Sequence, residues 1–273
     1  MQNLFVVAVI FYVLGTAGYY AYLFFQRNSL QKLGWWLHGI GFLCQTLLLV
    51  WTYLKTGHMP ANNLHETLSL VAWALVGVHL VISLRFKIKI LGIYAAPLAV
   101  FILLLATQFP KEPVQPLNLL KGVWLTTHII TVFAGDAALA LAAGAGMLYL
   151  IQEHAIKSKT RGFFFKRLPS LELLDNTGHA CIVVGFTLLT IGLISGMIYA
   201  KIKWAVFWSW DTKEIWSAVT WLFYAVLLHE RLAVGWRGRR AAIMAIAGFV
   251  VMLFTFFGVN LLLSGHHGQF TRW

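Results

Sequence analysis

The sequence predicts an all-α protein, a polytopic membrane helix bundle of about eight transmembrane helices with both chain termini outside. Apolar residues make up 60% of its 273 positions and charged residues only 11%, whereas soluble domains carry about 25% charged residues. Apolar runs of about 20 residues, the length that crosses a bilayer as a helix, recur along the whole chain. We therefore expect a single integral membrane domain over residues 1–273.

The expected spans are separated by short polar connections. They cover residues 4–25, 33–54, 65–84, 90–107, 123–152, 172–200, 215–233 and 241–263. The first span lacks a basic leader and a small-residue cleavage site, so we interpret it as retained rather than as a signal peptide. Small residues recur at every fourth position from Ala134 to Gly146, and Gly192 and Gly196 lie in the next span. We expect these two helices to pack closely and form the core of the bundle.

The distribution of basic residues predicts the orientation of the bundle. Of the 21 Lys and Arg residues, 14 fall in one alternate set of connections and span ends, and the other 7 fall in the second set. The positive-inside rule assigns the richer set to the cytoplasm. Topology thus explains the net charge of +12, and we exclude nucleic-acid binding. The basic and Phe residues of the cytoplasmic connection 153–171 are typical of a segment that contacts anionic membrane lipid.

The most unusual stretch is residues 204–229, WAVFWSWDTKEIWSAVTWLFYAVLLH, which holds five of the twelve tryptophans. Asp211 and Glu214 form a capping-box pattern, which predicts that a helix begins directly after Asp211. Residues 200–214 are then a loop at the membrane surface, where we expect Trp204, Trp208 and Trp210 to form a flat aromatic shelf. An interfacial aromatic belt is one explanation for such tryptophans. A belt does not require the tight W-x-W-D-x-K-E string, so we favour a binding surface for a large planar ligand.

Histidines predicted at the same membrane surface indicate the kind of ligand. His128 lies at the outer end of the span 123–152, and His267 follows the outer end of the span 241–263. Two neutral imidazoles on opposite faces hold a haem iron in many proteins, and tryptophan rings are suited to contact the porphyrin. Each histidine alone is more often a surface or structural residue. Their combination with the tryptophan loop favours a haem site on the outer face.

Other polar residues are predicted to lie deeper in the membrane or in loops. His229 lies near the cytoplasmic end of the span 215–233, and ionisable residues at membrane depth are functional candidates by default. Asp136 lies two helical turns from His128 and must be neutral, paired or hydrated. His58 and His65, in the connection after the second span, are expected to be solvated. The two cysteines lie in separate spans without a C-x-x-C motif, so we expect no thiol exchange by this chain itself.

These motifs resemble those of the CcsA (ResC) proteins of the system II cytochrome c biogenesis pathway, in the haem-handling superfamily with the tryptophan-rich WWD motif. The resemblance is carried by residues 204–229, by GWRGRRAA (235–242), by GVNLLLSGHH (258–267) and by NLHETLSLVAW (63–73). It covers nearly the whole chain and is strongest from Lys121 to His267. The family usually has Pro at the position that Thr212 occupies here, and Thr is compatible with the first turn of a helix.

The resemblance implies roles for individual residues. His128 and His267 would ligate haem b on the outer face, with His266 as the alternative to His267. His229 would receive haem from the cytoplasmic side, together with a ligand from a CcsB (ResB)-type partner subunit. The platform that holds haem for the apocytochrome would comprise Trp204, Trp208, Trp210, Asp211 and Trp216. By position alone, the candidates to bind the haem propionates are Lys201, Lys203, Lys213 and Arg272.

The resemblance also implies a reaction, in which haem vinyl groups are joined to the two thiols of a C-x-x-C-H motif in apocytochrome c. The chain would then be the CcsA subunit of a CcsBA-type synthase in the bacterial inner (plasma) membrane, active with its CcsB partner. One alternative is a non-catalytic, HemX-like haem-binding membrane regulator, against which the complete W-x-W-D-x-K-E string argues. Another is a structural scaffold with an aromatic belt, which predicts no bound haem.

Overall fold

The computed structural model describes residues 2–86, 88–110, 122–159, 162–163 and 165–258, and within them every regular element is a helix. The α-helices are α1 (Gln2–Phe25), α2 (Asn28–Thr56), α3 (Leu64–Phe86), α4 (Leu91–Ala106), α5 (Val123–Lys157), α6 (Leu171–Trp204), α7 (Thr212–His229) and α8 (Arg239–Leu253). Two π-helical segments, η2 (Glu230–Val234) and η3 (Phe254–Gly258), directly follow α7 and α8. The predicted all-α fold is confirmed, and a helix lies in each of the eight expected spans; residues 259–263 of the last span lie outside the described residues.

Among the described residues, six helices are long and apolar enough to cross a membrane: α1, α2, α3, α5, α6 and α8 with η3. The apolar helix α4 has only 16 residues. The polar first turn of α7, which includes Lys213 and Glu214, and its terminal His229 lower the mean hydropathy of that helix. The chain is therefore a multi-pass membrane protein. The count of about eight crossings and the side on which the termini lie stay predictions.

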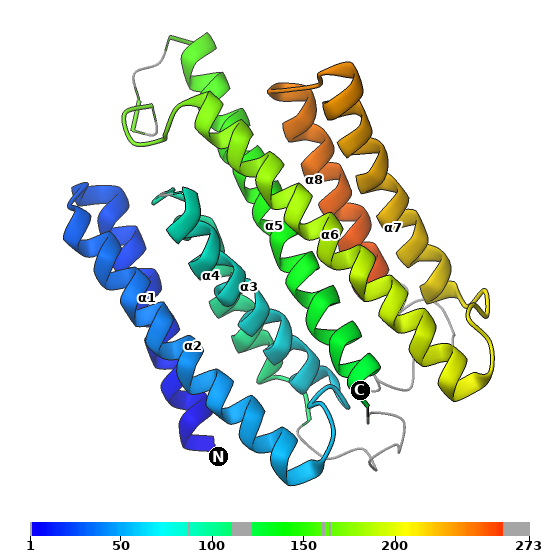
Figure 1. The fold of residues 1–273 in the computed structure, drawn as a ribbon. Helices are drawn as coiled ribbons and strands as arrows, with labels where there is room; N and C mark the ends of the chain where they lie inside the picture. Colours follow the sequence, from blue (N-terminus) through cyan, green and yellow to red (C-terminus); the bar gives the residue numbers. More distant parts are fainter. Residues whose placement is uncertain (1, 87, 111–121, 160–161, 164, 259–273) are drawn as a thin grey trace.

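The helices run up and down the bundle as sequential antiparallel pairs (Figure 1). We call the end that carries the connection 205–211 the Trp end, and the opposite end, which carries the connection 235–238, the Arg end. The N-terminus, the α2–α3 connection and the start of α5 lie at the Trp end, whereas the α5–α6 and α7–α8 connections lie at the Arg end (Figure 1).

The predicted core pairing of α5 with α6 is confirmed, because these two helices pack along their length. A Cβ atom built on Gly135 of α5 would lie 3.1 Å from the carbonyl oxygen of Gly185 of α6. A Cβ atom on Gly192 would lie 2.6 Å from a methyl carbon of Val132. The small residues thus allow the two backbones to approach closely, and this close approach positions the candidate site at the Trp end.

Candidate functional site

His128 is held in one tautomer near the start of α5. Its Nδ1 atom lies 2.7 Å from the carbonyl oxygen of Gly192 in α6. Because a carbonyl oxygen can only accept, Nδ1 carries the hydrogen and donates it. The lone pair of the neutral ring is then on Nε2, which is the arrangement found in most metal-ligating histidines of proteins.

Gly196 provides the space that the His128 ring occupies. A Cβ atom built on Gly196 would lie 2.7 Å from Nδ1 and 2.9 Å from Cε1 of His128. Real Cβ atoms almost never approach other atoms so closely. Two small residues one turn apart on α6 therefore hold His128: Gly192 accepts its hydrogen bond and Gly196 leaves room for its ring.

His128 is one of the residues that line an open cavity of about 210 Å³ at the Trp end. The cavity lies between α5, α6 and the start of α7, and Trp204 and Trp208 of the predicted platform also line it. Its walls are mainly aliphatic and aromatic. Polar groups on the walls come from His128, Thr67, Tyr199, Lys213, Glu214 and Ser217. A cavity that is mostly apolar, with a few convergent polar groups, is typical of small-molecule sites.

The residues present fit a porphyrin with carboxylate substituents. Because Nδ1 of His128 donates to Gly192, Nε2 is the nitrogen that would bind iron, and the indoles offer large apolar faces. Lys213 is the only Lys or Arg among the described residues that line the cavity. Lys201 instead donates to the carbonyl oxygen of Ala205 at 2.9 Å, and its ammonium lies 5.2 Å from the centre of the Phe207 ring.

The tryptophan loop is not the flat shelf that we expected. The rings of Trp208 and Trp210 are 6.1 Å apart and nearly perpendicular, at 83°, and Trp204 packs on Tyr199 at 82°. Edge-to-face packing is a preferred geometry of aromatic pairs. Ala205 and Trp210 adopt positive φ angles of 60° and 59°, which turn the chain sharply at both ends of the loop. Trp210 remains 75% exposed.

The helix α7 begins where the capping pattern predicts, directly after Asp211. The capping box itself does not form as predicted, because the Asp211 side chain makes no cap hydrogen bond. The carboxylate of Glu214 accepts a hydrogen bond from the backbone N–H of Ser209 at 2.8 Å instead. Glu214 thus ties the tryptophan loop to α7 and fixes the loop beside the cavity.

Three of the five predicted platform residues do not line the cavity. Trp210 and Asp211 belong to the same loop but do not line the cavity. Trp216 packs edge-to-face on Phe254 of η3, with ring centres 4.6 Å apart. His266, His267 and Arg272 lie outside the described residues.

The connection between α2 and α3, together with the first turn of α3, forms part of the site, which the sequence reasoning missed. Ala61 and Thr67 line the cavity, and His58 is only 6% exposed. His65 bonds through Nδ1 to the carbonyl oxygen of Ala106 at 2.8 Å. The expectation that both histidines are solvated is therefore wrong, because this connection folds back over the helix ends instead of extending into solvent.

A capping pattern in the sequence could have indicated this ordered connection. The side chain of Asn63 accepts a hydrogen bond from the backbone N–H of Glu66 at 2.8 Å. The carboxylate of Glu66 accepts one from the backbone N–H of Asn62 at 2.9 Å. This reciprocal arrangement starts α3 and holds the connection in place.

Asp136, for which the sequence indicated no partner, lies on α5 below the cavity. The positive charge of Lys213 acts on its carboxylate. Lys213 lines the cavity. It also interacts electrostatically with Asp136 and Asp211.

His229 lies at the Arg end, remote from this cavity. It is exposed and continues an exposed stripe on α7 at helical spacing. The other exposed residues of the stripe are Ile215, Val219, Leu222 and Val226. The imidazole of His229 therefore faces the surroundings of the bundle, and the structure does not bring it together with His128.

Comparisons with known proteins agree on one family. The sequence profile described as Cytochrome C assembly protein matches residues 61–267. The chain is 34% identical to the cytochrome c biogenesis protein CcsA of Mesostigma viride, over 92% of this chain and 90% of that protein. It is 33% identical to the CcsA protein of Microcystis aeruginosa, over 82% of this chain and 83% of that protein.

The fold is similar to that of a solved structure, the cytochrome c haem lyase CcmF, with a TM-score of 0.64. The two chains are 16% identical, and the match covers 98% of this chain but only 48% of that one. At this identity the likeness concerns the fold alone. The chain thus has the helical architecture of about half of that protein.

Proposed function

Because the chain belongs to the CcsA family of cytochrome c assembly proteins, we propose that it is the haem-transferring subunit of a cytochrome c synthase. Its general role in cytochrome c biogenesis follows from the family. The proposal assigns it to the bacterial inner (plasma) membrane with the Trp end facing outward, as the positive-inside rule predicts. The observation that carries the proposal is the locked imidazole of His128 at a tryptophan-lined cavity.

Haem b is the substrate in this proposal, held at the Trp end while it is presented to apocytochrome c. His128 would ligate the iron through Nε2, because Nδ1 donates to Gly192. His267 would provide a further ligand, as the resemblance implies. The indoles of the platform contact the porphyrin, and Lys213 pairs with a propionate, since opposite charges attract strongly at a partly desolvated site.

The proposed reaction is the addition of two cysteine thiols to the two vinyl groups of haem. In each addition the S–H bond breaks and an S–C bond forms at the vinyl carbon next to the ring. The hydrogen ends on the terminal vinyl carbon, so no electrons are gained or lost. The contribution of the chain is to hold the iron and the propionates so that the vinyl groups face the incoming C-x-x-C-H peptide.

A second haem-binding position is proposed at the Arg end, where His229 would receive haem from the cytoplasmic side. Its exposure on the outer stripe of α7 suits a shared site, in which a CcsB-type subunit supplies the other ligand. A histidine that faces only lipid would be costly to place there, and a partner subunit removes that cost.

The test is to purify the chain with a co-expressed CcsB-type partner and to measure haem stoichiometry and the visible spectrum. We expect a low-spin bis-histidine spectrum that weakens in His128→Ala and in His267→Ala. His154→Ala is the matched control, because His154 is an exposed histidine near the opposite end of the same helix. Transfer of haem to a C-x-x-C-H reporter should fall in parallel in both ligand variants.

Other outcomes would redirect or remove the proposal. Haem that is bound normally but never attached to the reporter would favour the HemX-like regulator. Haem that is lost only in His229→Ala would assign the stable site to the Arg end. Absence of haem with and without the partner would leave only the structural scaffold.

A further inference from the structure

The helix that carries His229 does not end at that residue. It continues as the π-helical segment η2, and Arg231 in this segment is only 8% exposed. π-Helical turns are rare and are frequently found at functional sites. Arg231 thus points into the protein, two residues after His229 points outward.

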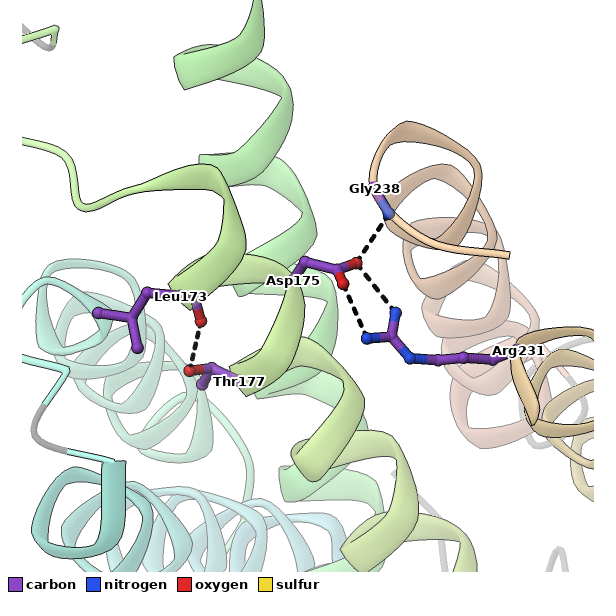
Figure 2. A network of polar contacts seen from close by, with 5 residues as sticks. All are labelled: Leu173, Asp175, Thr177, Arg231 and Gly238. Atoms are coloured by element: carbon purple, nitrogen blue, oxygen red, sulfur yellow. Dashed lines mark hydrogen bonds and ion pairs between the residues drawn. The ribbon is translucent and has the colours of Figure 1, made fainter. Parts of the chain in front are cut away.

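Arg231 is held by a largely buried carboxylate from another helix (Figure 2). Its two terminal nitrogens donate to the two carboxylate oxygens of Asp175 in α6, at 2.9 Å and 2.8 Å. The backbone N–H of Gly238, which leads into α8, donates to Asp175 at 2.9 Å. The side chains of Arg231 and Asp175 are only 7% and 12% exposed. One carboxylate therefore connects α6, η2 and the start of α8.

This contact determines the geometry of η2 more tightly than a single hydrogen bond would. The guanidinium is a rigid planar fork, and bidentate pairing with a carboxylate specifies both its distance and its plane. Gly238 adopts a positive φ of 66°, which allows its N–H to reach the same carboxylate. The three donors leave η2 little freedom to rotate or slide relative to α6.

We propose that Asp175 is a positioning residue for His229. Because the backbone between His229 and Arg231 is helical, fixing the inward direction of Arg231 also fixes the outward direction of His229. The Asp175–Arg231 pair therefore sets the height and orientation at which the imidazole meets haem and the partner subunit. This inference rests on the proposed function of His229 as a haem ligand.

The experiment uses the complete complex with its CcsB-type partner, in a His128→Ala background, so that the haem observed is that of the Arg end. Asp175→Asn removes the charge, and Arg231→Lys keeps the charge but loses the bidentate fork. His229→Ala is the reference. Glu153→Gln is the matched control, because it removes two carboxylate pairs at the same end, with Lys157 and Arg239, whose side chains are exposed.

Two readouts distinguish positioning from simple stability. Haem titration measures affinity, and electron paramagnetic resonance of the ferric low-spin haem reports the orientation of the axial imidazole planes. Loss of a residue that orients a metal ligand typically lowers metal affinity by about 10–100-fold. We expect Asp175→Asn to lower haem affinity within that range and to shift the g-values. Arg231→Lys should have a smaller effect, and Glu153→Gln none.

Each outcome decides the inference. Unchanged haem affinity and unchanged g-values in Asp175→Asn and Arg231→Lys would refute the positioning role of Asp175. If His229→Ala still loses its haem in that case, the proposed function of His229 stands. If His229→Ala keeps its haem, the proposed role of His229 fails, and the inference fails with it. If Asp175→Asn does not accumulate in the membrane, Arg231→Lys decides. If neither accumulates, the pair is required for folding and the positioning role is rejected.

Discussion

Replacing Gly196 by alanine should disturb haem binding at the Trp end while leaving the helix intact. The added Cβ atom would lie 2.7 Å from Nδ1 and 2.9 Å from Cε1 of His128. An ordinary van der Waals contact is 3.4–4 Å, so the ring must move by roughly 1 Å. That movement weakens the 2.7 Å hydrogen bond from Nδ1 to Gly192, which fixes the tautomer and the direction of Nε2.

The expected loss follows from the role of this hydrogen bond. Removing an interaction that orients a metal-ligating histidine typically lowers metal affinity by about 10–100-fold, or about 1.4–2.7 kcal/mol. Helix propensity acts in the opposite direction, because Ala is favoured over Gly in a helix by about 1 kcal/mol. Gly196→Ala should therefore bind haem more weakly without a matching loss of folding stability.

The assay is haem titration by visible absorbance with the partner subunit present, in a His229→Ala background. Gly39→Ala is the matched control, because Gly39 is also helical and a Cβ atom there meets no atom within 4 Å. We expect wild-type haem affinity in the control. Wild-type affinity and an unchanged spectrum in Gly196→Ala would refute the claim that this packing directs His128 toward iron.

Two further changes test the walls of the cavity. Lys213→Gln removes its cation and should weaken haem binding by about fivefold, corresponding to roughly 1 kcal/mol for a partly exposed ion pair; Lys201→Gln should leave the titration unchanged. Trp208→Ala removes an aromatic wall. It should weaken haem binding in the same titration by about 0.5–1.5 kcal/mol, in addition to the loss from the smaller apolar area buried against haem. Trp36→Ala is its control, because Trp36 is 63% exposed on α2 and does not line the cavity. If a variant and its control weaken haem binding equally, the cavity residue in that pair has no specific role in holding haem.

The sequence was sufficient for the parts of the fold that depend on local pattern. Apolar runs predict helices because backbone groups in a membrane must be paired within the segment. The position of Asp211 predicts where α7 begins. The proximity of His128 to Trp204 and Trp208 follows from the up-and-down order of the helices, because the start of α5, the end of α6 and the start of α7 all lie at the Trp end (Figure 1).

Contacts between residues far apart in the chain could not be predicted in the same way. Asp175 and Arg231 are 56 positions apart, and neither belongs to a motif that would indicate the pair. The left-handed conformations of Ala205 and Trp210 have no sequence signal, because positive φ angles are usually adopted by Gly or Asn. The tertiary structure imposes them, and they produce the perpendicular rings of the tryptophan loop.

The length of α7 implies that the two proposed haem positions are separate sites. Its 18 residues span about 27 Å at 1.5 Å per residue, with Lys213 at one end and His229 at the other. No side chain bridges such a distance. Effects of mutations more than about 10 Å apart usually add within about 0.5 kcal/mol. The amount of haem bound per complex should therefore fall in His128→Ala and in His229→Ala. In the double variant it should fall by the sum of these two losses. The measurement is haem titration of the purified complex, so that each site is filled from solution and not through the other. A double variant that binds as much haem as either single variant would refute two separate sites.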